Sequence, residues 1–180
     1  VGGELNAFTT KEETTVYTIF PQGAAARAIE LVADLAINSQ FPEAELDKER
    51  EVVIDEINSY RDTPSEAVYD DFEDMVYAGT PLGHNILGSA ETVAALGSKD
   101  CRDFLHRHYT VGNTVVFYSG PQSPNHIADL VERCFEGLPH GAEKKQTAAN
   151  VFTTKSAEVT IDGLHQSHVV LGIEVDSLYG

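Results

Sequence analysis

The sequence predicts an α+β fold, in which helices pack on a largely antiparallel sheet. Two strand-forming segments, 4–9 and 13–20, follow one another at the start of the chain with only a short polar turn between them. Two more, 158–161 and 167–174, are neighbours near its end. The segments between these pairs do not follow the regular β-α-β order that favours a parallel sheet. The 180 residues are enough for a single domain, 1–180, with one core.

The first two strands are expected to form a hairpin. Residues 4–9 are followed by a turn at 10–12, and the segment 13–20 is rich in β-branched and aromatic residues, which favour extended structure. Proline and glycine then end the second strand. Residues 24–38 carry apolar side chains at the helical period, so this segment is predicted to be an amphipathic helix packed on the sheet.

The rest of the chain is predicted to be mainly helical. Pro42 occupies a first-turn position where proline is tolerated, and it begins a helix that runs to about Tyr60. Ser65 and Ser89 are placed to cap two later helices. The further predicted elements are helices at 66–77, 90–96, 99–108 and 123–135, a buried strand at 113–119, and a polar connector at 139–150.

The charge of the chain limits its partners. Its formal net charge is −17, which makes nucleic acid and anionic membranes poor partners and a neutral or basic peptide, or a divalent cation, better ones. Solubility alone also accounts for an acidic surface. No run of about 18 apolar residues occurs, so no membrane span is expected. Cys101 and Cys134 form neither a metal motif nor a disulfide framework.

Two glutamates on the helix that begins near Pro42 are the candidate site residues. At about 100° per residue, Glu49 and Glu56 lie almost in register, two turns apart, at the edge of an apolar stripe. The stripe consists of Leu46, Val53, Ile57 and Tyr60. A carboxylate at the edge of a buried face needs a metal ion, a cation or hydrogen-bond donors. Helix geometry alone does not choose between a metal and an ion pair with lysine or arginine.

Several stretches, taken in order, resemble one known family. Residues 2–12 read Gly-Gly-Glu-Leu-Asn-Ala-Phe-Thr-Thr-Lys-Glu, and residues 49–57 read Glu-Arg-Glu-Val-Val-Ile-Asp-Glu-Ile. Further matches are Asp62-Thr63-Pro64, Pro81-Leu82-Gly83, Ile86-Leu87-Gly88, His108-Tyr109, and Gln166 with His168. Together they resemble the pitrilysin/insulinase family of zinc metallopeptidases, which includes the mitochondrial processing peptidases, and the resemblance covers residues 1–172.

The resemblance implies roles for particular residues. In that family two histidines of an HxxEH motif and one distant glutamate hold Zn²⁺, and the glutamate of HxxEH activates the zinc-bound water. Glu56 corresponds to the distant ligand, and Glu49 to a second glutamate that supports catalysis near the metal. The strand Asn6-Ala7-Phe8-Thr9 corresponds to the edge strand that binds a substrate peptide by strand addition. An ordinary paired strand is the alternative.

One family motif is missing. No HxxEH occurs in the sequence, and in relatives it lies about twenty residues before the segment that matches 1–3. We therefore expect a fragment of the zinc-bearing half-domain, inactive by itself, whose partners are a peptide or unfolded protein substrate and a second half-domain or homologous subunit. The alternatives are a non-catalytic scaffold or regulatory subunit of the same family and a peptide-binding domain. Cytoplasm, periplasm and organelles all remain open.

Overall fold

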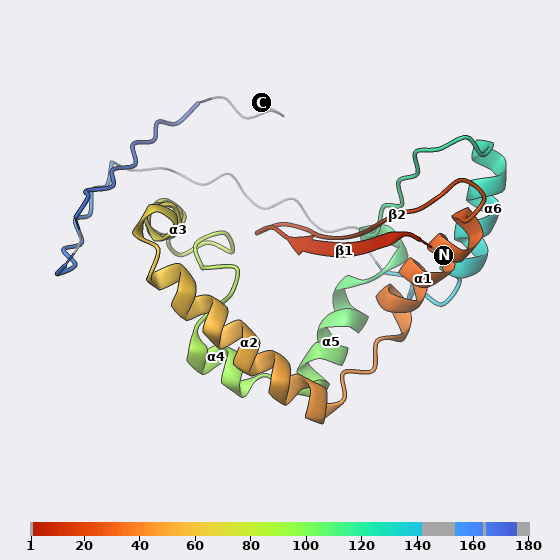
Figure 1. Cartoon of the computed structure of the whole chain (residues 1–180), viewed down its shortest axis with the longest axis horizontal. Coiled ribbons are helices and arrows are strands. Elements are labelled where there is room, and N and C mark those ends of the chain that lie inside the picture. The colour runs from red at the N-terminus through yellow and green to blue at the C-terminus, as the bar shows by residue number, and fades with distance from the viewer. Residues whose placement is uncertain (1, 142–153, 164, 176–180) are drawn as a thin grey trace. The chain divides into compact units, whose positions relative to one another are not determined.

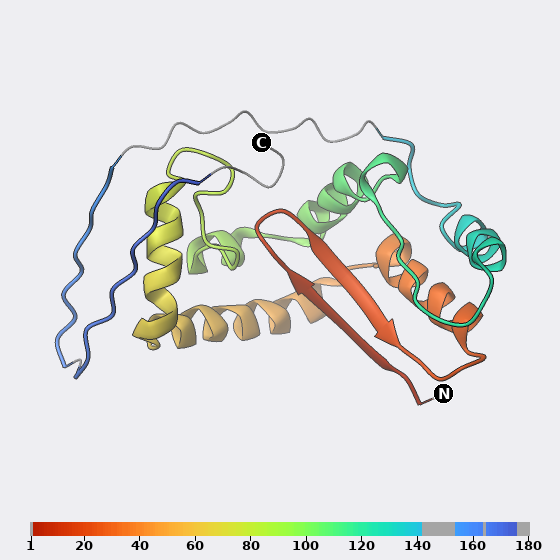
Figure 2. The ribbon, with the colours of Figure 1, turned by 90° about the horizontal axis from the view of Figure 1, so that it is seen from above.

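The computed structural model describes residues 2–141, 154–163 and 165–175 (Figures 1 and 2). Helices and a small antiparallel sheet make up this part of the chain, which agrees with the predicted α+β class. In chain order the elements are β1 (Glu4–Thr9), β2 (Thr14–Ile19), α1 (Ala25–Asn38), α2 (Glu43–Arg61), α3 (Pro64–Val76), α4 (Ala90–Ala95), α5 (Ser98–His108), the 3₁₀ turn η1 (Val111–Asn113) and α6 (Pro124–Cys134).

The described residues group into two compact units. One unit comprises those within 1–47 and 96–146, and the other those within 48–95 and 147–180. Each unit therefore joins segments that are far apart in the sequence. The first contains the hairpin, α1, α5 and α6, and the second contains most of α2, together with α3 and α4.

The hairpin has the predicted antiparallel register. Glu4 pairs with Ile19 at one end and Thr9 with Thr14 at the other. In the loop between the strands, the Thr10 N–H donates to the Glu13 carbonyl at 2.8 Å, and the Thr10 hydroxyl oxygen accepts from the Glu13 N–H at 3.1 Å. Side chain and backbone of one threonine thus close the turn, which is a common role for a short polar side chain.

The core of the first unit lies where α1 packs against α6. Ala25 and Ile29 of α1 meet Ile127 and Leu130 of α6, and all four are buried. Helix α1 also contacts β2, while all six residues of β1 are exposed, so this helix packs against one strand of the hairpin. Partly buried apolar side chains surround the four, and they are Phe20, Tyr118, Val131, Cys134 and Phe135.

The second unit is a helical group with one tethered loop. Ile57 of α2 and Val93 of α4 are its buried apolar residues. The Asn85 amide nitrogen donates to a carboxylate oxygen of Asp70 on α3 at 2.6 Å, and the Asn85 side-chain oxygen accepts from the Leu87 N–H at 2.8 Å. Asn85 therefore ties the loop that follows α3 to this helix.

The predicted strands outside the hairpin are wrong as strands. Residues 113–119, 158–161 and 167–174 have no partner strand among the described residues, and the sheet in this part of the chain is two-stranded. Asn113 is instead the last residue of η1. Most side chains of these segments face solvent, with Val115 at 92% and Leu171 at 92% exposure, although Tyr118 is partly buried against the core. A pattern of β-formers predicts an extended segment, but a strand also needs a ladder to pair with. Most of the predicted connector 139–150 lies outside the described residues.

The helix predicted for 66–77 begins earlier, at Pro64, so Ser65 is not its cap. Thr63 occupies the N-cap position, but its hydroxyl donates to the Ser59 carbonyl of α2 at 3.0 Å and makes no cap bond to α3. Proline in the first turn explains the early start, because that position needs no N–H donor. The predicted cap Ser89 does accept a backbone N–H bond, from Thr92. The structure adds Ser123 as the N-cap of α6, where its side chain accepts from the His126 N–H.

Among the helices that the structure describes, none combines the length and the apolar character needed to cross a membrane.

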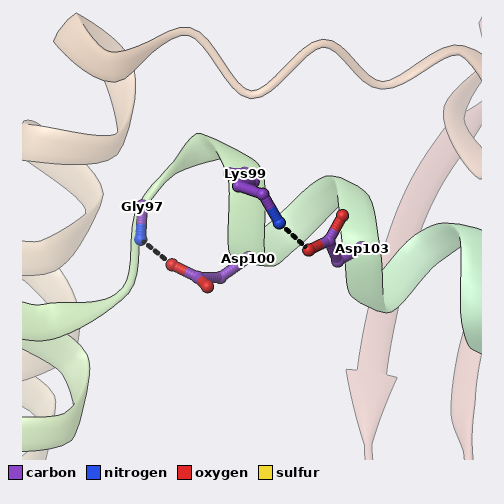
Figure 3. Close-up of polar contacts among 4 residues, drawn as sticks. All are labelled: Gly97, Lys99, Asp100 and Asp103. Carbon is purple, nitrogen blue, oxygen red and sulfur yellow. Dashed lines mark hydrogen bonds and ion pairs between the residues drawn. The ribbon is translucent and has the colours of Figure 1, made fainter.

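An ion pair on α5 gives a measurable prediction. The Lys99 ammonium donates to the Asp103 carboxylate one turn later (Figure 3). This hydrogen bond raises the pKa of Lys99 and lowers the pKa of Asp103. Asp103→Asn is expected to return the pKa of Lys99 toward its ordinary value, as measured by NMR titration of the side-chain amine.

The control for this experiment is Asp129→Asn, on the exposed side of α6, which should leave the pKa of Lys99 unchanged. The sign for stability also follows. The folded-state pKa of Asp103 is lowered, so its carboxylate stabilises the folded protein. This contribution to the free energy of unfolding is fully present above the unfolded-state pKa of Asp103, and it is lost as pH falls through the folded-state pKa. An unchanged Lys99 pKa in Asp103→Asn would show that the pair does not persist in solution.

Candidate functional site

Helix α2 carries the two candidate carboxylates, and its sequence explains why it is a helix. Acidic side chains, Glu43 and Glu45, occupy its first turn and Arg61 its last, an order that complements the helix dipole. Of the predicted apolar stripe, Ile57 is buried, while Leu46 and Val53 are half-buried and Tyr60 is exposed. The stripe is therefore buried most deeply at Ile57, in the C-terminal half of α2.

Both Glu49 and Glu56 are exposed on α2. The expectation that partial burial forces a partner on these carboxylates is therefore wrong, since an exposed carboxylate is solvated by water. The side chains of Glu49 and Glu56 project from the same side of α2, as expected. Seven residues of helix bring the second side chain to within about 20° of the first and about 10 Å further along the axis. At that spacing one carboxylate can touch an ion while the other acts on it at a distance.

A complete metal centre is not present in the part of the chain that the structure describes. Among these residues no group of three or more histidine, cysteine, aspartate or glutamate side chains is placed to hold an ion. Glu56 fits the part of a single oxygen ligand, since a solvent-facing carboxylate is one of the ligand types that zinc accepts. The remaining donors of a zinc centre would have to come from other residues.

The predicted substrate strand, Asn6 to Thr9, lies within β1, and all four side chains are exposed. Two hydrogen bonds show which backbone N–H groups of β1 face away from β2. The Ala7 N–H donates to the side-chain oxygen of Asn6 at 2.8 Å, and Thr10 donates to Glu13 across the hairpin. Because alternate residues of a strand bond to opposite sides, the N–H groups of Ala7 and Thr9 point outward. Those of Asn6 and Phe8 point toward β2.

No described strand pairs with this outer edge of β1. An edge with unpaired backbone donors and acceptors is a template for another extended chain. Of the groups on this edge, the Ala7 N–H is occupied by the Asn6 side chain, which an incoming carbonyl would replace. Phe8 and Tyr17 stack edge to face, with ring centroids 6.3 Å apart, and stiffen the strand pair.

Sequence reasoning missed a contact near the start of α2. A carboxylate oxygen of Glu43 accepts from the Ser98 N–H of α5 at 2.9 Å. The two residues are 55 positions apart, so helical periodicity carries no sign of the contact. One local signal was available: Gly97 precedes α5 in the position where a capping side chain is usual, and glycine has none to offer.

Comparison with known proteins identifies the family. Residues 1–90 match the family model described as insulinase, peptidase family M16, and residues 95–180 match that of the peptidase M16 inactive domain. An uncharacterized zinc protease of Bacillus subtilis is 34% identical over 179 residues, covering 97% of this chain and 42% of the relative. The mitochondrial-processing peptidase subunit beta of Blastocladiella emersonii is 27% identical over 174 residues, with 97% and 37% covered.

A solved structure gives the same result for the fold. The peptidase M16 inactive domain from Pseudomonas fluorescens superposes with a TM-score of 0.74 at 16% identity, covering 83% of this chain and 37% of that one. At that identity the likeness concerns the fold alone. The chain spans about two fifths of the length of the curated relatives it matches.

Proposed function

Because the chain belongs to the insulinase family, peptidase family M16, we propose that it is part of a zinc-dependent endopeptidase that cleaves peptides or processes signal sequences. Within it, the chain forms a half-domain of the mitochondrial-processing-peptidase type. Residues outside this chain supply the other zinc ligands and the general base. A second half-domain of the same protein, or a homologous subunit, is its partner.

Two glutamates of α2 contribute to the zinc centre in this proposal. Zinc, when bound, polarises the scissile carbonyl and lowers the pKa of its water. The carboxylate of Glu56 supplies one oxygen ligand to the metal. Glu49, two turns earlier and on the same side of the helix, orients the groups around the metal without ligating it.

The observation that carries the proposal is the open outer edge of β1. The described residues leave the outward N–H groups of this strand without a strand partner. A peptide that binds there in extended form is held by its backbone, so many sequences can be accepted. The charge of −17 favours a neutral or basic peptide over an acidic one.

The strand can be tested with two neighbouring proline variants, because proline removes one backbone donor. Ala7→Pro removes an outward N–H and should weaken binding of a basic ten-residue peptide about tenfold, the loss of one good hydrogen bond. Phe8→Pro removes a donor to β2 and should instead destabilise the hairpin. Fluorescence anisotropy of a labelled peptide, with chelator present to stop cleavage, measures the binding.

The melting temperature separates the two effects. Ala7→Pro should lose peptide affinity and keep its melting temperature, whereas Phe8→Pro should lower the melting temperature. Peptide affinity that is unaffected by Ala7→Pro would show that the outer edge of β1 is not the binding surface.

A non-catalytic subunit of the same family is the second candidate. It is favoured by the match of residues 95–180 to the inactive-domain model. Zinc content distinguishes the two functions, because a scaffold needs no bound metal and retains its assembly role without it.

A further inference from the structure

The N-terminus of α5 receives its cap from a different helix. Gly97 occupies the N-cap position and has no side chain, so it cannot satisfy the free N–H groups of the first turn. Instead a carboxylate oxygen of Glu43, in the first turn of α2, accepts from the Ser98 N–H at 2.9 Å. Ser98 is 6% exposed, which keeps water away from its side of this bond.

Three further contacts reinforce the junction, which we call the α2–α5 clamp and define as Gln40, Glu43, Gly97, Ser98, Asp100 and Arg102. The Asp100 carboxylate accepts from the Gly97 N–H at 2.9 Å (Figure 3). The Arg102 guanidinium donates to the Ser98 hydroxyl oxygen, and it also donates to the Gln40 carbonyl, just before α2, at 3.4 Å. Of these three contacts, the one from Arg102 to Gln40 joins the segment before α2 to α5, and the other two lie within the start of α5.

The hydrogen bond from the Ser98 N–H to the Glu43 carboxylate is stronger than an ordinary surface contact for two reasons. Its acceptor is ionised, and hydrogen bonds to charged groups are roughly twice as strong as neutral ones. The carboxylate also lies at the positive end of the α5 dipole. A helix anchored through such a bond in its first turn is hindered from rotating about its own axis.

That rotation sets where the candidate ligand points. Helix α2 runs without interruption from Glu43 to Arg61, so the direction of each side chain follows from the direction of the first. Glu56 lies about 140° around the axis from Glu43, and Glu49 about 120°. Glu43 therefore belongs to a different face and cannot itself join the metal ligands, but it can hold the other two in their direction.

We propose that Glu43 is a positioning residue for the metal ligand Glu56, acting through its bond to the Ser98 N–H. This inference rests on the proposed function, since it assumes that Glu56 binds zinc. An end cap that serves α5 alone is the competing explanation. Only the positioning role predicts an effect on metal affinity.

The experiment breaks the bond from each side in the intact protein and measures zinc affinity by chelator competition. Glu43→Ala removes the acceptor, and Ser98→Pro removes the donor at a helix position where proline is well tolerated. Each should weaken zinc binding about tenfold, the lower end of the range for groups that orient a metal ligand. Glu43→Gln keeps an acceptor oxygen and should recover most of the affinity. Glu51→Ala, exposed on α2, should change nothing.

The double variant and hydrogen exchange complete the test. If Glu43 and Ser98 act through one bond, the double variant binds zinc no more weakly than either single variant. Amide exchange at Ser98 should be about tenfold faster in Glu43→Ala, which reports the bond independently of the metal. Faster exchange with wild-type zinc affinity would overturn the positioning role and leave an end cap. Wild-type zinc affinity in Glu56→Gln would instead overturn the proposed function itself.

Discussion

Replacing Glu56 by glutamine in the intact protein should remove both bound zinc and peptidase activity. Glutamine keeps the shape of the side chain but offers a neutral oxygen, which is a poor zinc ligand. Groups that only orient a ligand change metal affinity by about 10–100-fold when replaced, and the loss of a ligand should exceed that range. Elemental analysis after dialysis, together with cleavage of a fluorogenic peptide, measures both effects.

Two other glutamates of α2 provide the matched series. Glu49→Gln should lower zinc affinity or activity by about 10–100-fold, as expected for a supporting group. Glu51→Gln, on another face of the same helix, should leave both unchanged. The loss of zinc affinity and activity should therefore be largest for Glu56→Gln, smaller for Glu49→Gln and absent for Glu51→Gln. Equal effects at all three positions would indicate damage to the helix in place of a metal site.

Leu130→Ala should produce the largest loss of stability. Leu130 is 4% exposed and packs with Ile127, Ala25 and Ile29 where α1 meets α6. Removing a buried leucine side chain costs transfer free energy and leaves a cavity, and such substitutions lower the free energy of unfolding by about 2–5 kcal/mol. Urea denaturation followed by circular dichroism gives the change from the shift of the midpoint.

Leu35→Ala is the control for the core. Leu35 lies on α1 but is 40% exposed, so the same chemical change should cost less than half as much. Similar losses at Leu130 and Leu35 would mean that the packing of α1 against α6 is not the core of this unit.

Helix positions could be predicted from the sequence because their signals are local. Apolar residues at the helical period, together with Pro42 and Ser89, predicted the helices to within a few residues. The hairpin followed from two neighbouring β-rich segments and the short turn between them. Strand pairing for 113–119 and 167–174 could not be predicted in the same way, because a ladder depends on a partner that no local pattern specifies.

In the candidate site, too, the local features could be predicted from the sequence and the features that depend on tertiary packing could not. The common direction of Glu49 and Glu56 follows from helix periodicity, and the structure places them on the continuous helix that this requires. Their exposure was not predictable, because it depends on what packs beside α2 in three dimensions. The bond from Ser98 to Glu43 joins residues 55 positions apart and lay equally beyond the reach of sequence patterns.

The central claim is that Glu56 is a zinc ligand, and anomalous diffraction at the zinc edge tests it most directly. Crystals of the intact protein should show one anomalous peak about 2.0–2.2 Å from a carboxylate oxygen of Glu56, the distance of a zinc–carboxylate bond. A zinc peak held by other residues, with the Glu56 carboxylate outside bonding distance, would contradict the account.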